Sequence, residues 1–326
     1  MKTLTLTSLA LAGFACGTLV LADAPKAAPK PAPAAVPKAP AIAPTAANVA
    51  YGSDPKQVLD FYQAKSDKPT PLMFFIHGGG WVAGSKSQVN GLAEVLAAGI
   101  SVVSVEYRFV QQAIAAGIKP PVEWPIHDAA RALQFVRSKA GEWNIDKERI
   151  GACGGSAGAC SSLWLAFHND LADPKSSDPI ARESTRLWCA AVIGAQTTLD
   201  PQQMKEWTPN SRYGGHAFGF AADPKTKVSQ FDAFLAGRET ILPWIAEYSP
   251  YANVTPDDPQ IYLNYSVAPG LGQPQKDPTH TSNFGVKLQE KCKSAGVPCE
   301  LYYPGATDAP HVTAAAYLID KLKAAK

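Results

Sequence analysis

Short apolar runs alternate with segments of helical spacing along most of the chain. The runs are almost continuously apolar, as strands buried on both faces are, and span residues 71–76, 100–105, 149–153, 188–195, 261–265 and 300–303. Helical spacing between and after them predicts helices at residues 92–98, 129–140, 157–168, 284–294 and 312–323. This alternation predicts a three-layer α/β fold, with a mostly parallel central sheet covered by helices on both faces.

One segment interrupts the alternation. Residues 197–255 are too many for an ordinary connection between a strand and a helix, and they carry nine aromatic side chains. We interpret the segment either as a lid over the end of the sheet or as additional helical packing, and the pattern does not choose between the two.

The N-terminus has the pattern of an export signal. An uncharged, apolar stretch from Leu4 to Leu21 follows Lys2 and ends in Val20-Leu21-Ala22, which predicts a cleavable signal peptide over residues 1–22. The protein is then expected to be secreted or periplasmic. Association with a membrane would need an uncleaved N-terminus, and a lipid on Cys16 is disfavoured because Gly13 replaces the larger apolar residue of that motif.

A proline-rich stretch separates this signal from the rest of the chain. Seven of the 28 prolines lie between Pro25 and Pro44, and residues 23–47 are rich in Ala, Pro and Lys. Such a composition cannot build a core and predicts an extended tether. The folded domain is therefore expected over residues 48–326.

The charge balance excludes some partners. The chain has 30 basic and 28 acidic side chains, a net charge of +2, and four of the basic ones lie in the first 47 residues. A nearly neutral domain gives no electrostatic basis for binding nucleic acid. The hydrophobic share of the whole chain, 46%, is ordinary for a globular protein that can bury a core by itself.

Two glycine motifs carry candidate chemistry. Gly154-Gly155-Ser156-Ala157-Gly158 follows a predicted strand and opens a predicted helix, which is the context that a G-x-S-x-G nucleophile turn requires. His77-Gly78-Gly79-Gly80-Trp81 follows the strand at 71–76, and its glycines leave backbone N–H groups free to hold a negative oxygen. A phosphate-binding loop is disfavoured because neither glycine motif has the spacing of one.

Together these motifs resemble those of α/β-hydrolase-fold serine esterases, close to the hormone-sensitive-lipase-like and bacterial feruloyl/acetyl-esterase-like groups. The resemblance extends from about Pro71 to the C-terminus and includes residues 124–133, which are similar to the helix before the nucleophile turn. It implies the α/β-hydrolase fold, with Ser156 as the nucleophile. The oxyanion hole would be formed by backbone N–H groups, those of Gly79, Gly80 and Ala157.

The triad order of this fold, serine then acid then histidine, points to the remaining residues. His311 lies between the last predicted strand and the last helix, where the fold places its base, and Asp277 follows the strand at 261–265. Asp308 is a local alternative for the acid. His280 is interpreted as a loop residue that could contact Asp277. Two further histidines are expected to be structural or substrate-facing, His168 and His216.

These residues predict hydrolysis of carboxylic esters through an acyl-enzyme, without a cofactor or a metal. Small esters or esterified polysaccharides, acetylated or feruloylated, are the expected substrates. One alternative is a prolyl-oligopeptidase-like peptidase, for whose propeller the chain has no room. Another is a non-catalytic binding module of the same fold, against which the intact Ser156, Asp277 and His311 argue.

The cysteines suggest no metal site. Five remain after the predicted signal is removed, and no Cys/His spacing is typical of zinc. Cys292 and Cys299 could meet across a helix-to-strand turn as a disulfide or remain separate thiols. The other three are expected to be small core residues, namely Cys153, Cys160 and Cys189.

Overall fold

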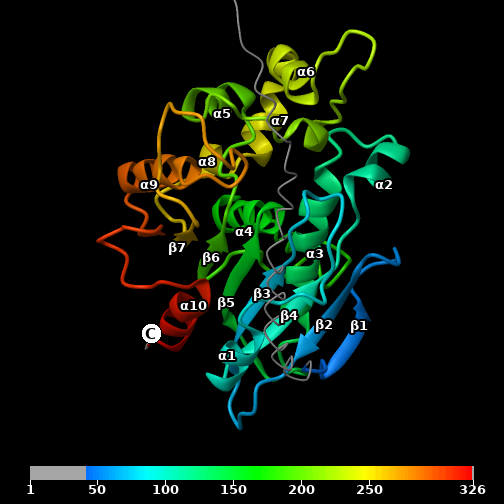
Figure 1. The fold of residues 1–326 in the computed structure, drawn as a ribbon. Coiled ribbons are helices and arrows are strands. Elements are labelled where there is room, and N and C mark those ends of the chain that lie inside the picture. The colour runs from blue at the N-terminus through cyan, green and yellow to red at the C-terminus, as the bar shows by residue number, and fades with distance from the viewer. Residues whose placement is uncertain (1–41, 325–326) are drawn as a thin grey trace, which may run out of the picture. The chain divides into compact units, whose positions relative to one another are not determined.

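The computed structural model of the protein describes residues 42–324. The predicted signal peptide and most of the predicted tether therefore lie outside the described residues. Eight strands form one sheet in the order β1-β2-β4-β3-β5-β6-β7-β8 (Figure 1). Their bounds are β1 (Ala46–Ala50), β2 (Val58–Tyr62), β3 (Thr70–Ile76), β4 (Ser101–Val105), β5 (Ile145–Gly155), β6 (Cys189–Ile193), β7 (Gln260–Asn264) and β8 (Cys299–Tyr302).

Strand direction divides the sheet into two parts. β1 pairs with β2 and β2 pairs with β4 in antiparallel fashion, whereas every pair from β4 through β3 to β8 is parallel. Parallel strands bring their carboxyl ends to one edge of the sheet, so the loops that follow β3, β5 and β7 open on the same side. The predicted mostly parallel sheet is confirmed.

Helices cover both faces of this sheet. One face packs against α1 (Leu92–Ala97) and α10 (Ala314–Lys323), and the other against α3 (Glu123–Ser138) and α4 (Ala157–Phe167). The remaining helices are α2 (Val110–Ala115), α5 (Pro201–Trp207), η1 (Gly215–Phe218), α6 (Gln230–Ala236), η2 (Arg238–Ile241), α7 (Leu242–Tyr248), α8 (Pro250–Asn253) and α9 (Asn283–Ala295). None of the helices within residues 42–324 is both long and apolar enough to cross a membrane.

The apolar run of β3 shows why two covered faces are needed. Phe74 and Ile76 join the core beneath α3 and α4, while Met73 and Phe75 join the core beneath α1 and α10. Successive strand residues point to opposite faces, so a strand buried on both sides is apolar at every position.

The folded part begins slightly earlier than predicted. β1 starts at Ala46, and the N–H of Thr45 already donates to Phe61 O at 2.7 Å. The domain boundary predicted at residue 48 is therefore too late, because the last tether residues pair with β2. β1, β2 and α2 were not anticipated from the apolar pattern.

The segment 197–255 folds as a group of short helices. It contains α5, η1, α6, η2, α7 and α8, and Figure 1 shows α5, α6 and α7 beyond α4, on the side away from most of the sheet. Its aromatic rings pack largely on one another, with the rings of Phe218 and Phe234 centred 5.5 Å apart. The indole of Trp164 on α4 donates to Glu247 O at 2.8 Å and fastens α7 to the core.

Candidate active site

Ser156 occupies the turn between β5 and α4. Its backbone has φ 54° and ψ −120°, which is strained for a residue other than glycine. The turn is held by the N–H of Ser156, which donates to Ile193 O at 2.9 Å, and by Ser156 O, which accepts from Cys160 N at 3.0 Å. Ser156 directly precedes α4, so its side chain lies at the helix N-terminus, where negative charge is favoured.

The glycines beside Ser156 are required because β3 passes close to the turn. A Cβ atom on Gly154 would lie 2.6 Å from Ile76 O, and one on Gly158 would lie 2.0 Å from the same oxygen. Real Cβ atoms do not approach backbone oxygens this closely, so only glycine lets β5 and α4 pack against β3 here.

We expect Gly158→Ala to lower the free energy of unfolding by about 3 kcal/mol, because the new methyl group meets backbone that cannot move aside. Gly141→Ala is the matched control. No heavy atom lies within 4 Å of its Cβ position, and we expect a change within about 1 kcal/mol. Urea unfolding of both variants measures the difference, and equal midpoints would contradict the steric account.

His280 and Asp277 extend a hydrogen-bonded chain from Ser156. His280 Nε2 lies 3.0 Å from Ser156 Oγ, and His280 Nδ1 lies 2.8 Å from Asp277 Oδ2. Asp277 Oδ1 accepts the N–H groups of Thr279 at 3.1 Å and His280 at 3.3 Å. A hydroxyl, an imidazole and a carboxylate in this sequence of contacts match a nucleophile, its base and the group that orients the base.

The prediction that His311 serves Ser156 disagrees with the structure. His311 Nδ1 lies 2.9 Å from Glu300 Oε2, and the N–H of His311 donates to Glu300 Oε1 at 2.7 Å. Its Nε2 lies 3.6 Å from Asp320 Oδ2. Glu300 on β8 thus offers both carboxylate oxygens to His311 and turns its ring away, while His280 takes the place beside Ser156.

The structure also locates the predicted acid, Asp277, and the alternative to it, Asp308. Asp277 lies beside His280, as the sequence suggested that it could, but it does not contact His311. Asp308 lines a different hollow, together with Glu300 and Tyr317, and does not line the cavity around Ser156. The signal for His280 in the sequence was its position three residues after Asp277 within a long loop.

The loop between β7 and α9, which carries Asp277 and His280, is fixed by buried polar side chains. Gln196 Nε2 donates to Thr279 O at 2.6 Å, directly beside His280. Asn283 Oδ1 accepts from Gly270 N at 2.8 Å, and its amide group donates to Trp207 O at 2.8 Å. These contacts determine where the loop turns, and therefore which histidine reaches Ser156.

The carboxylate of Asp277 remains charged at neutral pH. Burial raises the pKa of Asp277, but the hydrogen bond and the charge of His280 outweigh burial, and the net effect lowers that pKa. The side chains of His280 and Asp277 are 39% and 57% exposed, so solvent weakens the electrostatic coupling between them.

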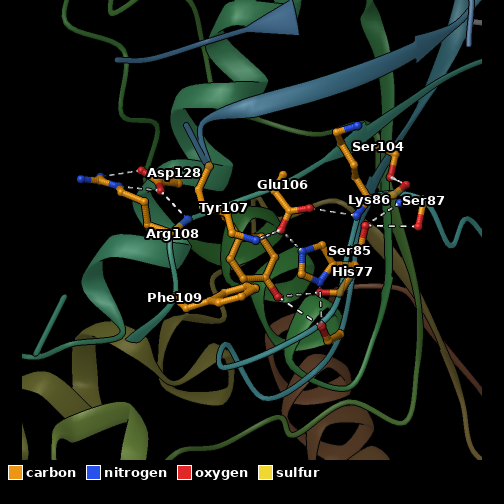
Figure 2. Close-up of polar contacts among 12 residues, drawn as sticks. His77, Ser85, Lys86, Ser87, Ser104, Glu106, Tyr107, Arg108, Phe109 and Asp128 are labelled. Atoms are coloured by element: carbon orange, nitrogen blue, oxygen red, sulfur yellow. Dashed lines mark hydrogen bonds and ion pairs between the residues drawn. The ribbon is translucent and has the colours of Figure 1, made fainter. Parts of the chain in front are cut away.

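A glycine-rich loop of residues 77–86, called the glycine loop below, faces Ser156 from the end of β3. The end of β4 and the segment that follows it hold its two ends, as Figure 2 shows. Tyr107 Oη donates to His77 O at 2.9 Å, and Glu106 Oε1 lies 3.3 Å from His77 Nε2. At the other end, Ser104 Oγ donates to Lys86 O at 2.6 Å, and Lys86 N donates to Glu106 Oε2 at 3.3 Å.

The carboxylate of Glu106 is suited to this anchoring role. Its side chain is only 9% exposed, and Lys56 Nζ lies 3.1 Å from Oε1. Burial raises its pKa, but hydrogen bonds and charge from His77 and Lys56 outweigh burial and lower the pKa overall. Glu106 therefore stays ionised, accepts from Lys86 N at one end of the glycine loop and lies beside His77 at the other.

The glycine loop presents backbone donors. Gly79 and Gly80 have φ of 105° and 63°, and Gly79 O accepts the N–H groups of Val82 and Ala83, each at 3.0 Å. Among the backbone hydrogen bonds of the described loops, turns and caps, none has the N–H of Gly79 or of Gly80 as its donor. Ala157 is the first residue of α4, where a helix leaves its N–H without an intrahelical acceptor.

The glycine loop and the nucleophile turn border a cavity of about 550 Å³. Gly79, Ser156, Asp277 and His280 all line it, and His311 does not. Among the described residues that line it, Asp277 is the only Asp, Glu, Lys or Arg. Apart from the imidazoles, the other polar side chains are neutral amides and hydroxyls, namely Ser85, Gln88, Asn90, Asn264, Tyr265 and Ser266.

Other candidate residues lie outside this cavity. His168 packs on Trp164, with ring centres 4.2 Å apart, and its Nε2 lies 2.9 Å from Glu247 Oε1. Cys292 and Cys299 are both free thiols, and the hydrogen-bond contact with Cys292 together with burial raises the pKa of the Cys299 thiol. Among the described residues, no group of His, Cys, Asp and Glu side chains has a metal-binding arrangement.

Comparison with known proteins identifies the family of the chain. Residues 59–266, more than half of the chain, match the BD-FAE family. Esterase LipC of Mycobacterium tuberculosis is 33% identical over 117 residues, which are 34% of this chain and 27% of that protein. The match therefore spans about a quarter of that relative's length.

Two solved structures share the fold. The acetyl ester-xyloside bifunctional hydrolase of Caldicellulosiruptor lactoaceticus has a TM-score of 0.56 and 23% identity, over 78% of this chain and 77% of that one. A truncated carbohydrate esterase from gut microbiota has a TM-score of 0.61 and 20% identity, over 85% of this chain and 95% of that one. The chain has the α/β-hydrolase fold, as predicted, and belongs to the BD-FAE family, a family of esterases.

Proposed function

We propose that the protein is a serine carboxylesterase whose triad is Ser156, His280 and Asp277. The observation that carries the proposal is the pair of contacts at His280, 3.0 Å to Ser156 Oγ and 2.8 Å to Asp277 Oδ2. His280 Nε2 takes the proton of Ser156 as its oxygen attacks the ester carbonyl, and Asp277 stabilises the imidazolium that forms.

The negative oxygen that develops on the substrate is held by backbone N–H groups of the glycine loop, at Gly79 and Gly80, and by that of Ala157. His280 then gives its proton to the departing alcohol, which leaves an acyl group on Ser156. Water, activated by the same histidine, attacks the acyl-enzyme, releases the carboxylic acid and restores Ser156.

The substrate class that we propose is an ester of a sugar hydroxyl, above all an acetyl ester of a polysaccharide. The cavity supports this because its wall carries neutral amides and hydroxyls, among them Gln88, Asn90 and Asn264. Such groups hydrogen-bond a hydroxyl-rich alcohol, whereas a charged alcohol would need an opposite charge. The structural neighbours include a carbohydrate esterase and an acetyl ester-xyloside hydrolase, which agrees with the proposal.

We also propose that the enzyme acts outside the cytoplasm, in the periplasm or the medium. The support is the sequence of the N-terminus, where Lys2 precedes an uncharged apolar stretch that ends at Ala22. N-terminal sequencing of the mature protein tests this, and a mature chain that still begins at Met1 would contradict it.

A substrate panel and a serine-reactive probe test the activity. The wild-type protein should hydrolyse p-nitrophenyl acetate and release acetate from acetylated xylan with a higher kcat/KM than it shows for methyl ferulate. A fluorophosphonate should label one peptide, the one that contains Ser156, and Ser156→Ala should remain unlabelled. A protein that hydrolyses no ester and takes no label would overturn the proposed function.

A further inference from the structure

The middle of the glycine loop depends on contacts that β4 does not provide. Gly79, Gly80 and Trp81 have positive φ in succession, at 105°, 63° and 58°. Trp81 is not a glycine, so this backbone shape persists only where surrounding contacts hold it. The indole of Trp81 donates to Ser161 Oγ at 3.0 Å, and Trp81 O accepts from Val110 N at 2.9 Å.

Gly80 is held by a residue from the 197–255 segment. His216 Nε2 lies 2.9 Å from Gly80 O. A carbonyl oxygen can only accept, so Nε2 carries the proton. Burial lowers the pKa of His216, and its ring is therefore neutral at pH 7. The contact joins two parts of the chain that are 136 residues apart.

The short helix η1, which carries His216, is itself fixed in place. Val122 N at the start of α3 donates to Ala217 O at 2.9 Å, and Phe220 N donates to Gly215 O at 2.9 Å. The ring of His216 also packs near that of Trp81, with centres 6.3 Å apart. Because these contacts anchor η1, the His216 side chain can restrain the glycine loop rather than move with it.

We propose that His216 is a positioning residue for the active site. Its hydrogen bond fixes the orientation of the peptide group at Gly80 and, through it, the direction of the neighbouring N–H groups that face the developing negative charge. The 197–255 segment then acts as a static clamp on the glycine loop. This inference rests on the proposed function for its catalytic consequence, but not for the structural contact itself.

The test compares two substitutions of His216 whose side-chain amides extend to different distances from the backbone. The amide nitrogen of His216→Gln can take the place of Nε2 and donate to Gly80 O, whereas that of His216→Asn is too short. We expect His216→Asn to lower kcat for p-nitrophenyl acetate about 10- to 100-fold, with KM changed less than about threefold, because the reacting groups lose their alignment. His216→Gln should restore most of the loss.

Two further measurements separate positioning from general damage. A trifluoromethyl ketone, whose serine adduct carries a negative oxygen, should bind His216→Asn more weakly by about the same factor as kcat/KM falls. Tyr213→Phe is the matched control, because the Tyr213 hydroxyl is buried without a partner among the described residues, and it should behave as wild type. Equal kcat values for His216→Asn and His216→Gln would overturn the proposal.

Amide hydrogen exchange tests the clamp without relying on activity. Residues 78–84 should exchange faster in His216→Asn than in the wild type, while His216→Gln should match the wild type. If the wild-type protein hydrolyses no ester, the proposed function fails and this exchange pattern alone decides the clamp. Equal protection of residues 78–84 in all three proteins would refute it.

Discussion

His280→Gln is expected to reduce kcat for p-nitrophenyl acetate on the order of a millionfold, while His311→Gln keeps it within about threefold. Glutamine cannot take up the proton of Ser156, although it can fill the volume of the imidazole. The structure places His280 Nε2 3.0 Å from Ser156 Oγ, whereas His311 is bound to Glu300. The two variants therefore separate the base that we propose from the structure from the base that the sequence predicted.

Folding must be verified before the rates are compared. His311 bonds to Glu300 and lies near Asp320, so its replacement can lower stability without touching the chemistry. Circular dichroism at the assay temperature establishes that both variants are folded. The assignment of His280 would be rejected if His311→Gln lost activity as completely as expected for His280→Gln, or if His280→Gln retained more than about 1% of it.

The nucleophile turn could be predicted because its cause is local. Gly154, Ser156 and Gly158 lie within five residues of one another, and the close approach of Ile76 O to both glycines explains their spacing. The apolar runs of the central strands were equally readable, because burial on both faces leaves no polar position in them.

The first two strands, β1 and β2, could not be predicted from apolar runs. β1 lies at the edge of the sheet, and its five residues are partly or fully exposed, so it lacks the run of large apolar residues that a buried strand carries. Its register comes from pairing with β2, for example Val49 with Leu59, which the sequence alone does not reveal. The domain boundary at residue 48 was placed too late for the same reason.

The histidine beside Ser156 differs from the predicted one because its position depends on contacts between distant segments. His311 satisfies the chain order of the fold, but its ring Nδ1 and its backbone N–H both bind the carboxylate of Glu300. His280 reaches Ser156 because contacts far along the chain shape its loop, including Gln275 N, which donates to Asn210 Oδ1 at 2.9 Å. No local pattern around either histidine contains this information.

The proposed base and the proposed acid thus lie on one loop, three residues apart, rather than on two loops that follow different strands. Asp277 accepts from the backbone N–H of His280 as well as from its ring. The pair is consequently a local unit whose orientation relative to Ser156 depends on the β7–α9 loop and on Gln196, which donates to Thr279 O. The loop after β8, which holds His311, is left without a part in the proposed chemistry.

Asp277→Asn is expected to lower kcat by about 10³-fold, somewhat less than the roughly 10⁴-fold loss known for a buried triad aspartate. The amide keeps the shape of the side chain but removes the negative charge that stabilises the imidazolium of His280. The effect is reduced because the Asp277 side chain is 57% exposed, so water already screens this charge.

Asp308→Asn is the matched control, because Asp308 lines a hollow that does not contain Ser156 and should leave kcat unchanged. The rates are compared at pH 7, where Asp277 is ionised because its pKa is lowered from the ordinary value. For the same reason, protonation of Asp277 should cost activity only below its ordinary pKa of about 4. Near-wild-type kcat for Asp277→Asn would show that His280 needs no carboxylate, and the pair at Ser156 would then be a dyad.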